Sequence, residues 1–253
     1  MISALQKLFQ KTADIFDPRD SHIRALDLME SMFRLYSLVA IAAYRHAGAR
    51  DAKINRILWE QLPWPSRMSW KVFLQVLAEA DEHNFPDHFW DAFLAPLKQR
   101  ISHADITGSY DGLRRLADLD MDSVNVTPIY SESISCSPLE FFDAVVAYQS
   151  RFAGQGANEL PESALRFSPT FLKGAEELCA ELKPIWFACP PYVAKKVDSH
   201  EHAFFLLTPL ILEDGIEEVQ ATAFGLEDGR LYICFGDRKH PEVESLYPAA
   251  LWE

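Results

Sequence analysis

The sequence predicts an α+β protein in two parts: a helical bundle over residues 1–120 and an acidic α/β module with an antiparallel β-meander over residues 121–253. In the first part, apolar residues recur at steps of three and four, which is helical spacing. From residue 184 onward, short apolar runs alternate with turn dipeptides, which is typical of strands. With 253 residues, 49% of them hydrophobic, the chain is long enough to bury a core without disulfides or metals.

The longest helix of the first part is expected to begin at Asp20 or Ser21 and to end at about Ala47, where Gly48 stops it. A weaker amphipathic helix is expected before it, over residues 5–16. Because the apolar positions of the long helix form two adjacent stripes, we expect it to pack on more than one neighbour. These positions are Leu26, Met29, Phe33, Tyr36 and Ala40, and Leu28, Met32, Leu35, Val39 and Ala42.

Three further helices are expected. One covers residues 54–62, one begins at a cap formed by Ser66 or Ser69, and one covers residues 110–119. Between the last two, a helix is expected from about residue 87 through residue 101, ending near residues 102–103. Pro96 lies inside this helix and predicts a kink or a restart, because proline has no N–H to donate.

The second part is expected to begin with a helix at Ser137-Pro138, in which Glu140 completes a capping box, followed by a helix from Ser168-Pro169 to about residue 182. A β-meander of three strands follows, over residues 203–212, 218–224 and 230–235, joined by a strand over residues 185–188. Hairpin turns are expected at residues 214–215 and 228–229, which are both Asp-Gly.

The net charge of −13 is unevenly distributed. Residues 1–118 contain fifteen basic and fifteen acidic residues, so the negative charge lies in the rest of the chain. Binding of nucleic acid is therefore not expected, because phosphate contacts need a basic surface. A basic protein partner for the acidic half is expected instead.

Composition also predicts a cytoplasmic protein without membrane contact. The longest apolar run covers residues 35–44, which is too short to cross a bilayer. The four cysteines are scattered, with no C-x-x-C pair, as expected for reduced thiols in a cytosol.

Lys98-Gln99-Arg100-Ile101-Ser102-His103 is the most informative local motif. It resembles the R-x4-6-H signature of HEPN domains, which are helical bundles; many of them are metal-independent endoribonucleases whose Arg and His meet across a dimer cleft. Lys98 falls on the Arg position and His103 on the His position, but lysine lacks the fork that grips a phosphate. The resemblance implies either a ribonuclease using His103 with Lys98 or Arg100, or a degenerate bundle in which His103 caps the C-terminal end of a helix. We favour the second.

A wider resemblance points to accessory regions of bacterial signalling and defence proteins, where a HEPN-like bundle and a small α/β module precede an effector such as a kinase, an ATPase or a protease. It implies a non-catalytic regulatory or adaptor role by protein–protein contact, with a homodimer formed through the bundle. A small-ligand sensor with a pocket between sheet and helices is the remaining alternative. The matching stretches are residues 24–34, 65–70, 98–103 and 207–212.

Other candidate chemistry is weaker, and no cofactor is expected. His200 and His202 would share one face of an extended strand and are weak candidates for metal ligands. Cys136 precedes a helix N-terminus, where a thiolate is stabilised, but no base accompanies it. Trp64, between two prolines, and Trp252 are expected to be exposed contact anchors, whereas the other four tryptophans fall at core spacing.

Overall fold

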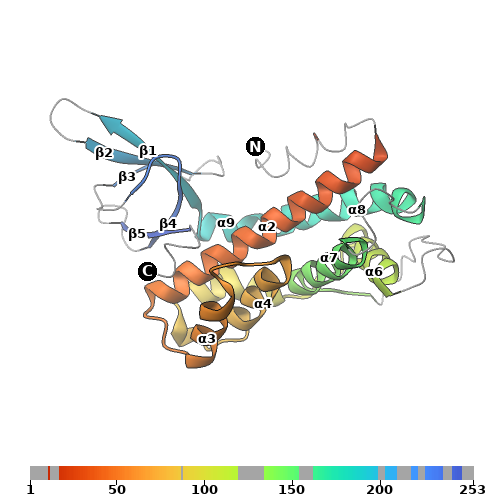
Figure 1. The fold of residues 1–253 in the computed structure, drawn as a ribbon, viewed down its shortest axis with the longest axis horizontal. Helices are drawn as coiled ribbons and strands as arrows, with labels where there is room; N and C mark the ends of the chain where they lie inside the picture. Colours follow the sequence, from red (N-terminus) through yellow and green to blue (C-terminus); the bar gives the residue numbers. More distant parts are fainter. Residues whose placement is uncertain are drawn as a thin grey trace.

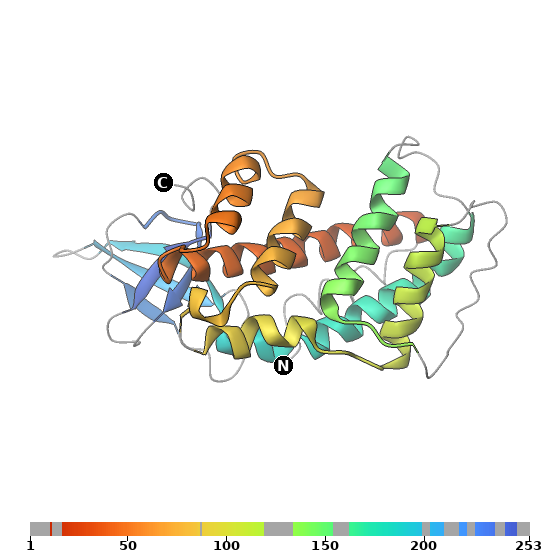
Figure 2. The ribbon, with the colours of Figure 1, turned by 90° about the horizontal axis from the view of Figure 1, so that it is seen from below.

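Helices and strands occupy separate stretches of the chain, which confirms the α+β class. The computed structural model describes residues 11, 17–86, 88–118, 134–153, 162–198, 203–209, 218–221, 226–235 and 241–246. The sheet lies at one end of the molecule, and α6 and α7 lie toward the other end (Figures 1 and 2). The helices are α2 (Pro18–His46), α3 (Ala52–Gln61), α4 (Arg67–Ala78), the 3₁₀ turn η1 (Glu82–Asn84), the π-helical turn η2 (Trp90–Leu94), α5 (Ala95–Lys98), α6 (Ala104–Asp118), α7 (Pro138–Ala153), α8 (Glu162–Glu181) and α9 (Lys183–Ala188). The strands are β1 (Pro191–Asp198), β2 (Ala203–Pro209), β3 (Val219–Ala221), β4 (Leu231–Phe235) and β5 (Glu242–Ser245).

The long helix α2 forms the axis of the molecule (Figure 1). It begins slightly earlier than predicted, because the Asp17 carboxylate accepts the Arg19 N–H at 2.8 Å and Pro18 fills the first turn. It ends before Gly48, whose φ of +101° suits glycine. Every residue from Tyr36 to Tyr44 is buried. The prediction that this helix packs on several neighbours is confirmed, because α4, α7, α8 and β5 all contact it.

Local capping chemistry starts α4 and α7 where the sequence predicts. The Ser66 hydroxyl accepts the Ser69 N–H, and the Ser69 hydroxyl accepts the Ser66 N–H, both at 3.1 Å. Both candidate caps therefore take part in one capping box. At α7, the Ser137 N–H donates to Glu140 Oε2 at 2.8 Å and the Glu140 N–H donates to Ser137 Oγ at 3.2 Å, which confirms the second predicted box.

The helix expected through residue 101 ends earlier, at Lys98. A wide turn precedes Pro96, in which the Ala95 N–H donates to the carbonyl of Trp90 five residues back, so the predicted restart is confirmed. The extension to Ile101 is wrong. Ile101 instead forms an antiparallel bridge with Cys136, through N–H to O distances of 2.8 and 3.1 Å, and this pairing satisfies its backbone outside a helix.

The helical body continues beyond residue 120 of the chain, because α7 and α8 pack on α2 and α6. α8 begins at Glu162, so the predicted start at Ser168-Pro169 is wrong and Pro169 lies inside the helix. Ala164 and Phe167 are buried in the turns before Pro169. Their packing outweighs the hydrogen bond that proline cannot donate.

The described strands form one antiparallel sheet in the order β3-β2-β1-β4-β5. The order departs from a simple meander, because β4 pairs with β1 and not with β3. Residues 185–188 belong to α9, so the predicted strand there is wrong. Pro184 lies in the first turn of this short helix, and Ile185 and Trp186 are buried in the helical core. The strand order also shows which strands the turn at residues 228–229 connects.

The turn at Asp228-Gly229 does not connect two paired strands, so its assignment as a hairpin is wrong. It is instead bound to β1. The Gly229 N–H donates to the Ala194 carbonyl at 2.8 Å, and Asp228 Oδ1 accepts the Lys196 N–H at 2.8 Å. The turn predicted at residues 214–215 and the helix predicted over residues 5–16 lie outside the described residues.

A buried histidine lies in the contact of α2 with α7 and α8. His22 Nε2 is 2.7 Å from the Tyr148 hydroxyl, and its ring lies 5.5 Å from that of Phe171. Burial lowers the pKa of His22 to about 4. Its Nδ1 has no hydrogen-bond partner among the described residues, so a proton there would create an unpaired buried N–H.

We therefore expect the free energy of unfolding to fall as the pH decreases from about 6.5 to about 4. In this window the unfolded state, with an ordinary histidine pKa, binds a proton that folded His22 does not, and the loss reaches about 3 kcal/mol. Urea unfolding followed by circular dichroism between pH 4 and pH 8 measures it. His22→Gln should flatten the profile, whereas His83→Gln, at an exposed histidine, should leave most of it. Parallel profiles for wild type and His22→Gln would contradict the assignment.

The close contact of α6 with α8 depends on glycine. A Cβ on Gly174 would lie 2.3 Å from Ser109 Cβ and 2.6 Å from the Asp105 carbonyl oxygen. Backbone cannot yield to such an overlap, so we expect Gly174→Ala to lower the free energy of unfolding by about 1–3 kcal/mol. The midpoint of urea unfolding measures this change. The control is Arg166→Ala, on the exposed face of the same helix. Equal stability of the two variants would refute the close-contact argument.

Candidate functional site

Lys98 is the last residue of α5, and Arg100 lies on the link between α5 and the Ile101–Cys136 bridge. The Lys98 ammonium lies 5.5 Å from the centroid of the Trp90 ring. Arg100 Nη1 donates to both Glu140 carboxylate oxygens, at 2.6 and 2.5 Å, and its Nη2 donates to the Ser135 carbonyl. Arg100 therefore fastens this link to the start of α7.

His103 lies on the other side of the bridge, immediately before α6. Its carbonyl oxygen accepts the Thr107 N–H at 3.0 Å, and its side chain is exposed. The predicted capping of a helix C-terminus is therefore wrong, because His103 stands at the N-terminal end of a helix. The reason is the early end of α5, which leaves Lys98 as its last residue and His103 just before α6.

A cavity of about 280 Å³ lies beside Lys98 and Arg100, where α4, α5 and α7 meet. Three carboxylates and two cationic side chains line it, and His103 does not. Lys71 also contacts one of these carboxylates, with Nζ 3.0 Å from Asp143 Oδ1. An RNA phosphate entering here would meet the carboxylates, so the cavity lacks the positive field of a phosphate cleft. The lining residues are Gln75, Ala78, Glu79, Lys98, Arg100, Ser137, Leu139, Glu140 and Asp143.

The other predicted chemical groups do not form a site among the described residues. Cys136 is fully buried, and burial raises the pKa of its thiol to about 12, so it is protonated at neutral pH. His200 and His202 lie outside the described residues. In the described ranges, no group of three His, Cys, Asp or Glu side chains is placed to hold a metal ion. Nor does any helix there combine the length and apolar character needed to cross a bilayer.

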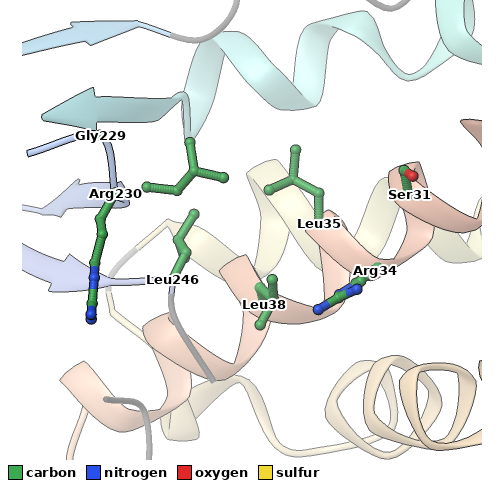
Figure 3. Close-up of a pocket in the computed structure, with 8 residues that line it drawn as sticks. Ser31, Arg34, Leu35, Leu38, Gly229, Arg230 and Leu246 are labelled. Atoms are coloured by element: carbon green, nitrogen blue, oxygen red, sulfur yellow. The ribbon is translucent and has the colours of Figure 1, made fainter. Parts of the chain in front are cut away.

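A larger cavity, of about 430 Å³, lies between α2 and the sheet (Figure 3). Its walls come from one stretch of α2 and from the ends of β4 and β5, about 200 residues away in the chain. The sequence gives no motif for it, because its residues belong to separate stripes of separate elements. The lining residues are Ser31, Arg34, Leu35, Leu38, Gly229, Arg230, Leu231 and Leu246.

The hairpin of α3 and α4, here called the tryptophan hairpin (residues 51–78), exposes three large apolar side chains. Trp64 is 93% exposed, Trp59 64% and Met68 47%. The predicted exposure of Trp64 is confirmed. The predicted burial of Trp59 is wrong: α3 buries only Ile54 and Leu58, and Trp59 comes one residue later, on a different face.

Comparison of the chain with protein-family models, with curated proteins and with solved structures found no match.

For the motif at residues 98–103, we expect Lys98→Ala and His103→Ala to leave RNA cleavage at the wild-type level, because the carboxylates around Lys98 repel the substrate backbone. A fluorogenic single-stranded RNA, incubated with each purified protein without metal, measures cleavage. Activity of the wild type that disappears in His103→Ala, with an unchanged circular dichroism spectrum, would instead establish the ribonuclease alternative.

Proposed function

We propose that this chain is a non-catalytic regulatory or adaptor protein that acts by protein–protein contact through the tryptophan hairpin. The observation that carries the proposal is Trp64, a large aromatic side chain that is 93% exposed at the turn between two helices. Tryptophan is enriched among the residues that dominate binding energy at interfaces. Pro63 and Pro65 restrict the backbone on both sides of it, so ordering this turn on binding costs little entropy.

The charge of the hairpin indicates which kind of surface it would contact. The hairpin, residues 51–78, contains four basic residues and two acidic ones, although the protein as a whole carries −13. Arg56 pairs with Glu60 inside the hairpin, with Nε 2.9 Å from Oε1, and Arg67 and Lys71 pair with Glu30 and Asp143 outside it. Among the described residues, the exposed Lys53 is the hairpin cation that no carboxylate balances. An acidic surface is the complement of such a patch.

A second copy of this chain supplies that surface. Residues 119–253 carry the excess negative charge of the protein, and Glu162, Glu227 and Asp228 are exposed there. A two-fold dimer would form the contact twice, with each hairpin against the acidic half of the other copy. This arrangement uses the predicted basic partner for the acidic half. It differs from the predicted homodimer through the bundle, because the hairpin of one copy contacts the acidic half of the other. The resemblance to accessory regions of signalling proteins supports a regulatory role for such a contact.

We expect the wild-type protein to self-associate in sedimentation velocity at micromolar to submillimolar concentration, more weakly in 500 mM than in 50 mM NaCl. Trp64→Ala should raise the dissociation constant by about 30-fold, the effect of losing one dominant interface residue. The control is Ile23→Ala, at an exposed apolar residue of α2 outside the hairpin. A wild type that stays monomeric at all concentrations, or a Trp64→Ala variant that associates as strongly as the control, would overturn the proposed contact.

A further inference from the structure

The cavity between α2 and the sheet combines apolar walls with cationic side chains. Figure 3 shows Leu35 and Leu38 on α2 and Leu246 beyond β5 around the same space, with Arg34 and Arg230 at its edge. Its volume of about 430 Å³ lies within the range of small-molecule sites. A ligand seated here would cover leucine surface with an apolar chain or ring.

The charge of this lining is unlike that of the rest of the protein. Two arginines and no carboxylate line the cavity, in a chain of net charge −13. The smaller cavity beside Lys98 makes the contrast clear, because three carboxylates line it. The lining between α2 and the sheet therefore favours a negatively charged group.

Arg34 is placed to bind that group. Its guanidinium carbon lies 5.0 Å from the centroid of the Trp70 ring, and among the described residues it has no carboxylate partner. Contact with the face of an aromatic ring attracts the guanidinium without using its N–H donors. A carboxylate at the rim would accept two of these donors in a bidentate contact.

Arg230 lies on the opposite wall and is held in place. Its Nη2 lies 2.8 Å from Glu227 Oε2, so part of its charge is already balanced. It therefore adds less to anion binding than Arg34 does. Its neighbour Leu231 extends the apolar wall from the start of β4.

We propose that this cavity is a binding site for a small amphiphilic carboxylate, whose apolar part lies among the leucines and whose carboxylate binds Arg34. The inference does not depend on the self-association proposed for the tryptophan hairpin, because no hairpin residue lines the cavity.

The probe is decanoate, compared by isothermal titration calorimetry with decan-1-ol, which has the chain without the charge, and with acetate, which has the charge without the chain. We expect decanoate to bind at least about tenfold more tightly than either. Arg34→Gln should weaken decanoate binding about tenfold and leave decan-1-ol binding unchanged, since one charge-assisted contact is removed. Leu35→Trp should abolish binding of both by filling the cavity. Arg24→Gln, at an exposed arginine of α2 outside the cavity, is the matched control.

Circular dichroism and urea unfolding show whether each variant is folded. Absence of decanoate binding to the wild type at millimolar concentration would overturn the proposal. So would equal affinities of wild type, Arg34→Gln and Leu35→Trp for decanoate, because the ligand would then lie elsewhere. A loss in Arg34→Gln that is equally large for decan-1-ol would overturn the role of Arg34 in binding the anion.

Discussion

The burial of α2 on several sides is the constraint on which the rest of the structure depends. Its middle is fully covered, and the small residues Ala40, Ala42 and Ala43 let neighbouring elements approach its backbone closely. α4, α7 and α8 cover its length, and β5 meets its last turn. A helix covered in this way cannot be stable alone in water, so its folding is coupled to the docking of the elements around it.

Polar side chains on α2 specify which neighbour lies where. Near the start, His22 meets Tyr148 of α7. In the middle, the Ser37 hydroxyl bonds the Trp70 carbonyl of α4 at 2.9 Å. At the end, the ring of His46 stacks on Phe235 of β4 at 4.4 Å, and its nitrogens lie 3.2 and 3.5 Å from Glu242 and Glu244 of β5. Apolar stripes alone would allow the neighbouring elements to slide along α2, whereas these directional contacts fix the position of each neighbour along the helix.

The sequence predicts local features such as helix caps well, and it predicts poorly where packing between distant segments overrides a local signal. The capping boxes at Ser66 and Ser137 were predictable because both partners lie three residues apart in the chain. The start of α8 was not, because the packing of Phe167 outweighs the signal of Pro169. Residues 185–188 form a short apolar run, which periodicity cannot assign to helix or strand. The pairing of β4 with β1 is decided by contacts between strands distant in the chain.

The same distinction separates what was predictable of the candidate sites. The sequence predicts a helix that continues past Lys98, whereas the bridge of Ile101 to Cys136 separates Lys98 at the end of α5 from His103 just before α6. The exposure of Trp64 was predictable from its two flanking prolines. The cavity at Arg34 was not, because its walls are assembled from opposite ends of the chain.

One contact joins the cavity to the tryptophan hairpin. Arg34 lines the cavity and stacks on Trp70, and Trp70 belongs to α4, one of the two helices of the hairpin. A carboxylate on Arg34 would change the charge beside Trp70 of α4. Coupling between two sites is reciprocal. If a ligand in the cavity changes the affinity of the hairpin contact by some factor, self-association changes the affinity for the ligand by the same factor. The stacked arginine is the physical link through which such coupling would act.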